Sequence, residues 1–221
     1  MDSIIKTAGL PPDFHIADMG SGKGYLTFAL NDYLVNSLHL NPEVTGVEIR
    51  RELVDRCNEI AQKAGYDRLH FQAGSIDSAE VPDADMLIAL HACDTATDDA
   101  ISRGIRGGAS VIICAPCCHK QIRKQMHPVN GLRAISEYGI LEERQAEILT
   151  DTIRALIMEA FGYRTKVFEF ISTEHTPKNV MLAGIRSKGE PTDKDKFLDQ
   201  VKNLKALFNI HYHQLEKLMG I

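Results

Sequence analysis

Apolar residues along the chain follow two alternating patterns. Short and nearly continuous apolar runs, such as 14–19 and 109–115, are typical of strands that are buried on both faces of a parallel sheet. Between several of these runs lie longer segments, such as 51–65 and 141–162, with apolar residues at helical spacing. This alternation, with short turns between the segments, predicts βαβ units and therefore an α/β fold.

The pattern predicts seven strands, at residues 14–19, 43–49, 68–74, 84–90, 109–115, 165–171 and 179–185. The connection between the last two, at 172–178, is too short for a parallel crossover, so we expect these strands to form an antiparallel hairpin. The predicted architecture is a Rossmann-like, doubly wound sheet, mostly parallel with strand seven antiparallel, and with helices on both faces. Ligands of such sheets bind beyond the carboxyl ends of the strands.

Length and composition suit one such domain. The 221 residues, 44% of them hydrophobic, can bury a full core, and we expect one α/β domain at 1–188 and a helical tail at 189–221 that packs on the domain or on a partner. There is no apolar run long enough for a membrane and no secretory signal, and the five cysteines suit reduced thiols, so we expect a cytoplasmic protein. About thirteen residues precede the first strand, which leaves open an additional N-terminal substrate-binding region or a partner protein.

The turn after the first strand reads Asp18-Met-Gly-Ser-Gly-Lys-Gly24. A nucleotide triphosphate loop needs a glycine where this chain has Ala17, and a dinucleotide fingerprint that begins at Gly20 needs one where it has Tyr25. Alternating glycines instead offer backbone without side chains against which a ligand can lie. The next strand ends at Glu48, where an acid can accept hydrogen bonds from ribose hydroxyls.

This arrangement resembles motif I of the class I S-adenosylmethionine-dependent methyltransferases. The resemblance implies S-adenosylmethionine as the cofactor, with Asp18 facing its ammonium end, Glu48 its ribose and the loop at 75–77 its adenine. The cofactor-binding residues that we predict are Asp18, Gly20, Ser21, Gly22, Gly24, Glu48, Ser75, Ile76 and His91.

Two cysteine-rich loops follow the fourth and fifth strands. Their residues His91, Cys93, Ala96, Thr97, Asp98, Cys117, Cys118 and His119 resemble a narrower group, which contains the acceptor-stem tRNA 2′-O-methyltransferases, methyltransferase-like proteins and the methyltransferase portion of a glutathione-transferase-domain protein. The resemblance covers roughly 18–120 and extends to 176–179. The chain departs from that group at Asp94, where glycine is expected, and at Lys120, where the tRNA enzymes tend to have a second histidine.

Methyl transfer from a sulfonium depends mostly on positioning, and it needs a base only when the acceptor must lose a proton. We therefore predict His91, Asp94 and His119 as catalytic residues; the alternative is that the histidines only bind loop backbone. A second alternative is a metal site built from Cys114, Cys117, Cys118 and His119. We predict no metal, because Cys114 should point along a buried strand and no second CxxC pair completes a closed site.

The charge distribution bears on the acceptor. The formal net charge is −5, yet residues 100–136 contain no acid and six cations. Four of these follow the fifth strand and could neutralise RNA phosphates: Lys120, Arg123, Lys124 and Arg133. The predicted function is an RNA methyltransferase, acting at a ribose 2′-hydroxyl. The alternatives are methylation of a protein or small molecule, and a non-catalytic module that keeps the cofactor pocket.

Overall fold

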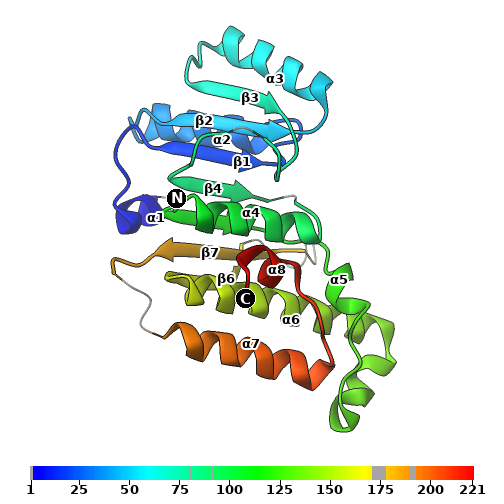
Figure 1. The fold of residues 1–221 in the computed structure, drawn as a ribbon. Helices are drawn as coiled ribbons and strands as arrows, with labels where there is room; N and C mark the ends of the chain where they lie inside the picture. The colour runs from blue at the N-terminus through cyan, green and yellow to red at the C-terminus, as the bar shows by residue number, and fades with distance from the viewer. Residues whose placement is uncertain (1, 80, 91, 171–177, 190–192) are drawn as a thin grey trace.

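The computed structural model describes residues 2–79, 81–90, 92–170, 178–189 and 193–221, and it contains one seven-stranded sheet (Figure 1). The strands are β1 (His15–Met19), β2 (Glu43–Glu48), β3 (Leu69–Ala73), β4 (Met86–Ala89), β5 (Val111–Cys114), β6 (Tyr163–Glu169) and β7 (Val180–Arg186). Their order in the sheet is β3-β2-β1-β4-β5-β7-β6. β1 to β5 pair in parallel, whereas β7 is antiparallel to both of its neighbours, β5 and β6. The predicted fold is confirmed.

The helices are α1 (Asp2–Ala8), α2 (Tyr25–Asp32), α3 (Arg51–Ala64), α4 (Thr95–Arg106), α5 (Lys120–Arg123), α6 (Gly139–Ala160), α7 (Lys194–Phe208) and α8 (Gln214–Met219). A π-helical turn, η1 (Tyr33–Ser37), continues α2, and a 3-10 segment, η2 (Asn130–Glu137), precedes α6. The sequence pattern did not predict α1, α5 and η2, which are short or lack apolar periodicity. No helix among the described residues has both the length and the apolar character to cross a membrane.

The sheet separates two apolar cores. Along β4, Leu87 and Ala89 point to the core beneath α4 and α6, whereas Met86 and Ile88 point to the core beneath α2 and α3. Successive side chains of a strand point to opposite faces, so a strand with helices on both faces must be apolar at every position. This is why β4 and β5 read as continuous apolar runs.

The carboxyl ends of the parallel strands lie together at one edge of the sheet, called here the carboxyl edge. Figure 1 shows the arrowheads of β1 to β4 at this edge, with α5 beyond them. The glycine turn follows β1 there, and the two cysteine-rich loops follow β4 and β5. The topology therefore brings all the predicted site segments to one side of the molecule.

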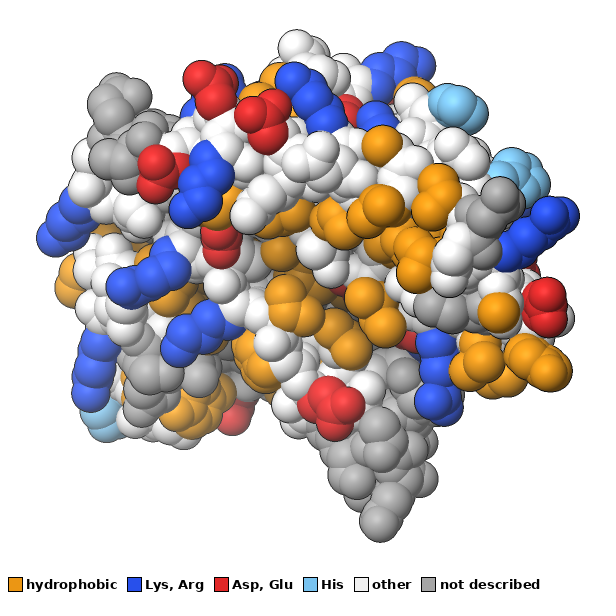
Figure 2. Space-filling view, turned by 90° about the horizontal axis from the view of Figure 1, so that it is seen from below, with side chains coloured by type: hydrophobic (Ala, Val, Ile, Leu, Met, Phe, Trp, Pro, Cys, Tyr) orange, Lys and Arg blue, Asp and Glu red, His pale blue; other side chains and the backbone are white. Residues whose placement is uncertain are grey.

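The sheet ends at β6, and the surface at this end of the sheet is apolar. Seen from below, the molecule shows apolar side chains gathered around a hollow (Figure 2). β6 is the edge strand at this end, and Val167 and Phe168 on it and Phe170 just after it are exposed. A cavity of about 840 Å³ lies here between α1, β6 and β7.

The C-terminal tail forms two helices rather than one. α7 packs on α6, and α8 packs on α4. Asn209 ends α7 in the left-handed conformation, with φ of 51°, a common way for a helix to stop. His213 begins α8 as its N-cap, where its Nδ1 accepts the backbone N–H of Leu215 at 3.2 Å.

His213 should make the stability of the tail depend on pH. Burial first, and then the charges of Arg154 and Lys205, lower its pKa from 6.5 to about 3, against the opposing charge of Asp151. Below about pH 6.5, His213 therefore binds a proton in the unfolded chain but not in the folded chain. The contribution of His213 to the stability of the fold is present above that pH and is lost as pH falls.

Replacing His213 with Asn keeps a capping acceptor but removes this titration. We expect the free energy of unfolding of the unchanged chain, relative to His213→Asn, to fall by up to about 1.4 kcal/mol for each pH unit below about 6.5. Urea unfolding of both proteins across this range measures the difference. Parallel pH dependence in the two proteins would contradict the prediction.

Candidate functional site

The glycine turn after β1 is anchored to β2 by backbone hydrogen bonds. The N–H groups of Gly20 and Ser21 both donate to the carbonyl of Val47 at 2.9 Å. Gly20, Gly22 and Gly24 have φ of 82°, 58° and 75°, a region that residues with a side chain rarely adopt. The turn therefore favours glycine at these positions.

Gly20 and Gly24, the first and last glycines of the turn, have different surroundings. A Cβ atom added to Gly20 would meet nothing within 4 Å, so open space lies beside this residue. A Cβ atom on Gly24 would come within 3.1 Å of Cys57, Phe28 and Phe71. Gly24 thus allows α2 and α3 to pack against the turn, whereas Gly20 leaves room for a ligand.

Glu48 lies beside the turn, as the sequence predicts for a ribose-binding acid. It is 6% exposed; its Oε2 accepts the N–H of Gly22 at 2.9 Å, and its Oε1 accepts the Nε–H of Arg50 at 2.8 Å and the N–H of Arg50 at 3.1 Å. The hydrogen bond from Arg50 is the main reason why the pKa of Glu48 is lowered, against the effect of burial. Glu48 is therefore an ionised acceptor that faces the turn.

The remaining predicted cofactor residues frame this space. Asp18 is buried at the end of β1, where its carboxylate accepts the hydroxyl of Thr27 at 2.7 Å. After β3, the hydroxyl of Ser75 donates to Asp77 at 2.5 Å, and the carbonyl of Ile76 accepts from Arg103 at 3.0 Å. His91 lies outside the described residues. The loop after β3 is also joined to β2, because Gly74 donates to the carbonyl of Glu48 at 3.1 Å.

These residues fit S-adenosylmethionine better than a phosphate ligand. The open space at Gly20 admits a ligand close to the backbone, and ionised Glu48 can accept a ribose hydroxyl at Oε2, which has one donor in this structure. Oε1 already has two donors from Arg50, so a second hydroxyl requires the exposed Arg50 side chain to move. Carboxylates at this turn would repel a phosphate but attract the positive charge of a sulfonium.

The two cysteine-rich loops are joined to each other. The Sγ atoms of Cys93 and Cys117 lie 3.0 Å apart, and the carboxylate of Asp94 accepts the N–H of Gln121 at 3.1 Å. Asp94 has φ of 55°, a conformation that favours glycine, which agrees with the glycine expected there from the resemblance. Such strain costs about 1–3 kcal/mol and persists only where contacts hold it. Asp94 therefore serves first to hold the loop after β4 against α5.

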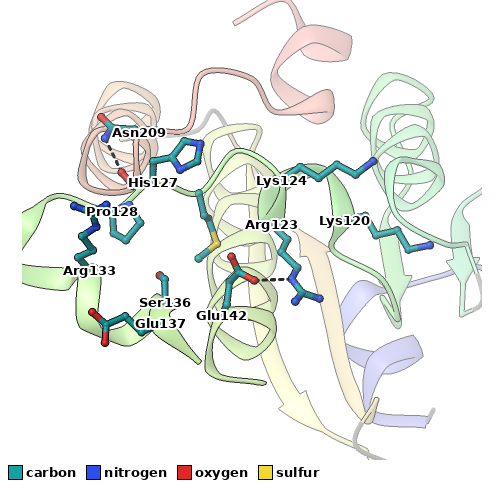
Figure 3. Close-up of a pocket in the computed structure, with 11 residues that line it drawn as sticks. Lys120, Arg123, Lys124, His127, Pro128, Arg133, Ser136, Glu137, Glu142 and Asn209 are labelled. Atoms are coloured by element: carbon teal, nitrogen blue, oxygen red, sulfur yellow. Dashed lines mark hydrogen bonds and ion pairs between the residues drawn. The ribbon is translucent and has the colours of Figure 1, made fainter. Parts of the chain in front are cut away.

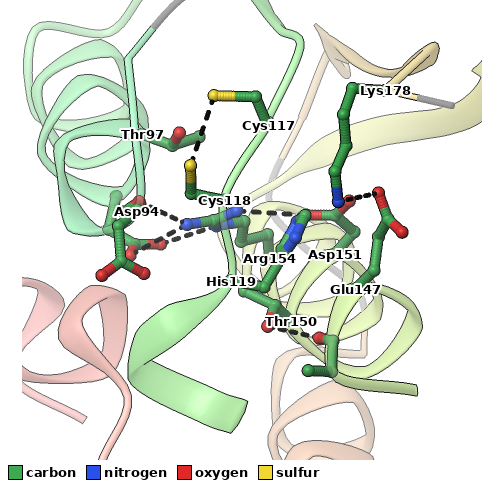
Figure 4. Close-up of polar contacts among 12 residues, drawn as sticks. Asp94, Thr97, Cys117, Cys118, His119, Glu147, Thr150, Asp151, Arg154 and Lys178 are labelled. Carbon is green, nitrogen blue, oxygen red and sulfur yellow. Dashed lines mark hydrogen bonds and ion pairs between the residues drawn. The ribbon is translucent and has the colours of Figure 1, made fainter. Parts of the chain in front are cut away.

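A buried polar network lies beneath these loops (Figure 4). Arg154 of α6 is 1% exposed and donates to both carboxylate oxygens of Asp98, at 2.8 and 3.1 Å, to Asp151 at 3.1 Å and to the carbonyl of Asp94 at 2.8 Å. These carboxylates raise the pKa of Arg154 against the effect of burial, so it stays charged. Burial raises the pKa of Asp98, and the charge of Arg154 opposes that rise.

His119 belongs to this network rather than to the open surface. It is 2% exposed, and its Nε2 lies 3.3 Å from Oδ1 of Asp151. Its Nδ1 has no hydrogen-bond partner among the described residues, and neither has Oδ2 of Asp151. A histidine that donates Nε2–H to a carboxylate keeps Nδ1 as its basic nitrogen, which is the orientation of a general base.

Sequence reasoning did not single out Asp151 and Arg154. A signal was available, because both lie on the buried face of α6 three residues apart, between Leu149 and Ile157. Charged residues on the apolar face of a helix are rarely buried unless they are paired. Of the predicted segment at 176–179, Lys178 donates to Glu147 of α6 at 3.1 Å, and residues 176 and 177 lie outside the described residues.

A groove of about 790 Å³ lies beyond the carboxyl edge, between α5, η2, the start of α6 and the end of α7 (Figure 3). Its lining includes Lys120, Arg123, Lys124 and Arg133, the four residues predicted to meet RNA, together with Glu137 and Glu142. Arg123 is paired with Glu142 at 3.0 Å and with Glu143 at 2.6 Å. The other cations of the acid-free segment face elsewhere: Arg103 donates to the carbonyls of Ile76 and Val81, and Arg106 to that of Leu218.

The chain is similar to known methyltransferases in sequence. A family model described as a methyltransferase domain matches residues 1–125. An uncharacterized methyltransferase of Bacillus subtilis (strain 168), YcgJ, is 30% identical over 80 residues, which cover 36% of this chain and 29% of that protein. The human glutathione S-transferase C-terminal domain-containing protein is 24% identical over 198 residues, covering 79% of this chain and 30% of that protein. The chain thus spans about 30% of the length of these relatives.

The fold agrees with that of solved methyltransferases. Geranyl diphosphate C-methyltransferase from Streptomyces coelicolor A3(2), crystallised with Mg²⁺, geranyl diphosphate and S-adenosyl-L-homocysteine, matches with a TM-score of 0.52 at 12% identity, over 84% of this chain and 79% of that chain. The predicted Rossmann-like fold is confirmed, and the match to a methyltransferase domain is consistent with the predicted cofactor, S-adenosylmethionine. The narrower group of RNA 2′-O-methyltransferases stays a prediction, as do the roles of individual site residues.

Glu48→Gln tests the cofactor half of the site. Glutamine still offers an oxygen to Gly22, but it loses the charge and places an amide opposite Arg50. Because hydrogen bonds to charged groups contribute about 1.5–3 kcal/mol, we expect the Kd for S-adenosylhomocysteine to rise by about tenfold to a hundredfold in calorimetric titration. Glu43→Gln, at the exposed start of the same strand, is the matched control and should bind normally. Unchanged affinity in Glu48→Gln would mean that the ribose binds elsewhere.

Proposed function

The chain belongs to the methyltransferase-domain family, and we propose that it transfers the methyl group of S-adenosylmethionine to a ribose 2′-hydroxyl of RNA. The observation that carries the choice of RNA is the basic groove beside the cofactor half of the site. Four cations and two carboxylates line it, so the groove has a positive balance in a chain whose net charge is −5. Positive grooves at such an edge attract phosphate backbones.

Three of the four cations are available to a ligand. Lys120, Lys124 and Arg133 are exposed and have no ion-pair partner among the described residues, whereas Arg123 is held by two glutamates. Arg123 therefore shapes the groove, and the other three carry its charge. This narrows the predicted phosphate-binding set from four residues to three.

The strand that leads into the groove lies near the strand that leads into the cofactor turn. β5, which leads into α5, is two strands away from β1, which leads into the glycine turn. With neighbouring strands about 4.8 Å apart, the two strand ends are about 10 Å apart. An RNA strand whose phosphates contact Lys120 would thus pass near the loops after β4 and β5.

The residues at this edge supply positioning and proton acceptance. When bound, the cofactor provides a methyl group that is already activated on a sulfonium. Glu48 and the glycine turn orient the donor, and the basic groove orients the acceptor. Holding both reactants in place lowers the entropic part of the reaction barrier. A hydroxyl acceptor must lose its proton, and His91 and His119 are the predicted bases. His119 is buried against Asp151, so it can act only if the loop after β5 moves to expose its Nδ1.

The decisive experiment offers tritiated methyl donor and the purified chain to fractionated cellular RNA, protein and metabolites. We expect label in RNA. The variant Lys120→Ala/Lys124→Ala/Arg133→Ala should bind RNA more weakly. Three phosphate contacts to a single strand give the logarithm of the binding constant a slope of about −2 against the logarithm of the salt concentration, and we expect the variant to lose that slope. Filter binding at several salt concentrations measures it.

The control removes the same charge elsewhere. Lys63→Ala/Lys196→Ala/Lys202→Ala changes exposed lysines of α3 and α7 and should keep both the salt slope and the labelling of RNA. Label only in protein or metabolites, with no salt dependence of binding, would overturn RNA as the acceptor and leave the methyltransferase assignment intact.

The predicted bases have their own test. We expect His91→Ala/His119→Ala to lower kcat by about a hundredfold or more, because general bases typically contribute 10²–10⁴-fold. Affinity for S-adenosylhomocysteine should stay nearly unchanged in the single variant His119→Ala, whereas His91→Ala also removes a predicted cofactor contact. Single-turnover methylation of the RNA substrate measures the rate. Full activity in the double variant would show that the histidines serve only loop structure, and His39→Ala, at an exposed turn, is the control for a histidine outside the site.

A further inference from the structure

Three thiols meet at the carboxyl edge, outside the cofactor half of the site. Cys93 follows β4, and Cys117 and Cys118 follow β5. Their three Sγ atoms lie within 4.8 Å of one another; Cys117 is 3.0 Å from Cys93 and 3.7 Å from Cys118. We propose that these three cysteines bind one Zn²⁺ ion as a tris-thiolate site with an open fourth position.

The spacing of the sulfur atoms suits zinc. A Zn–S bond of about 2.3 Å in tetrahedral geometry places the ligand sulfurs about 3.8 Å apart. The pair Cys117–Cys118 already has this separation, and Cys93 needs to move by less than about 1 Å to reach it. The loops are held at this distance by other contacts, because Asp94 binds both Gln121 and Arg154.

The ligand set differs from the one that spacing in the sequence suggests. Cys114 is fully buried on β5, and His119 is turned toward Asp151, so neither belongs to the cluster. Cys93 enters it instead, from a loop 24 residues earlier in the chain. The structure thus joins ligands from two strands, which a local CxxC pattern cannot show.

Among the described residues, the cluster has three ligands and no fourth. In the described part of the chain, no histidine, carboxylate or further cysteine joins the three thiols, and Cys93 is exposed. Three protein ligands with one open position are typical of zinc sites that bind a water molecule or a substrate atom. The site would therefore bind its metal while leaving room for an acceptor group.

Zinc competes with protons for these three sulfur atoms, because a cysteine binds the metal as a thiolate. When zinc binds, each of the three thiols releases its proton to solvent as its S–Zn bond forms. A Cys93–Cys117 disulfide is the competing arrangement, but it would use two of the three thiols and needs an oxidant.

Metal binding can be measured on the full chain without any methyl transfer. The protein, free of a histidine tag, is reduced, stripped with a chelator under argon and titrated with Zn²⁺ in competition with a chromophoric chelator, and with Co²⁺ to detect thiolate-to-metal charge-transfer absorption. We expect one metal ion per chain. Cys93→Ser, Cys117→Ser and Cys118→Ser should each weaken binding at least tenfold.

Two cysteines serve as controls. Cys57→Ala and Cys114→Ala remove buried thiols outside the cluster and should keep the full affinity, and titration with S-adenosylhomocysteine verifies the fold of every variant. The proposal is overturned by absent Zn²⁺ binding in the reduced protein, by binding that survives all three cluster substitutions, or by a Cys93–Cys117 disulfide whose reduction yields no metal site. None of these outcomes bears on the proposed methylation of RNA.

Discussion

The buried guanidinium of Arg154 holds together the half of the site where the acceptor must bind. It joins α6 to α4 through Asp98, and α6 to the loop after β4 through the carbonyl of Asp94. A buried charge of this kind is costly to remove from water, and removing one partner of such a pair typically costs about 3–5 kcal/mol. The positions of Cys93, of the start of α5 and hence of the basic groove all follow from this contact, because Asp94 also binds Gln121.

The two halves of the site are built on different principles. Around the cofactor, Glu48 and backbone groups hold the turn, and local sequence motifs encode the contacts within β1, β2 and their loops. On the acceptor side, side chains of α6 reach back to loops that lie 32 to 60 residues away in sequence. The family model matches residues 1–125, which include the glycine turn and both cysteine-rich loops but not α6. The match to the family model therefore supports the cofactor half of the site more directly than the acceptor half.

This difference explains how much the sequence could predict. β4 and β5 were predictable because burial on both faces leaves an unbroken apolar run, and Glu48 was predictable because its distance from the glycine turn is set by one βαβ unit. The pairing of Cys93 with Cys117, and of His119 with Asp151, was not predictable, because these contacts depend on how loops and α6 meet after folding. The spacing of apolar residues within one segment gives no information on such contacts between segments. The acid-free segment was misleading for the same reason: Arg103 and Arg106 bind backbone carbonyls, and only three cations remain for a ligand.

The acceptor must be argued from the loops rather than from the sheet. The fold resembles that of a methyltransferase crystallised with geranyl diphosphate, and a common fold does not determine a substrate. What distinguishes this chain is the combination of a positive groove, three thiols and a histidine oriented by a carboxylate at one edge. Under the proposed function a hydroxyl acceptor would use the groove and the histidine, and under the proposed metal site a soft acceptor would use the ion. His119 is buried whereas Cys93 is exposed, so the two groups lie at different depths of the same edge.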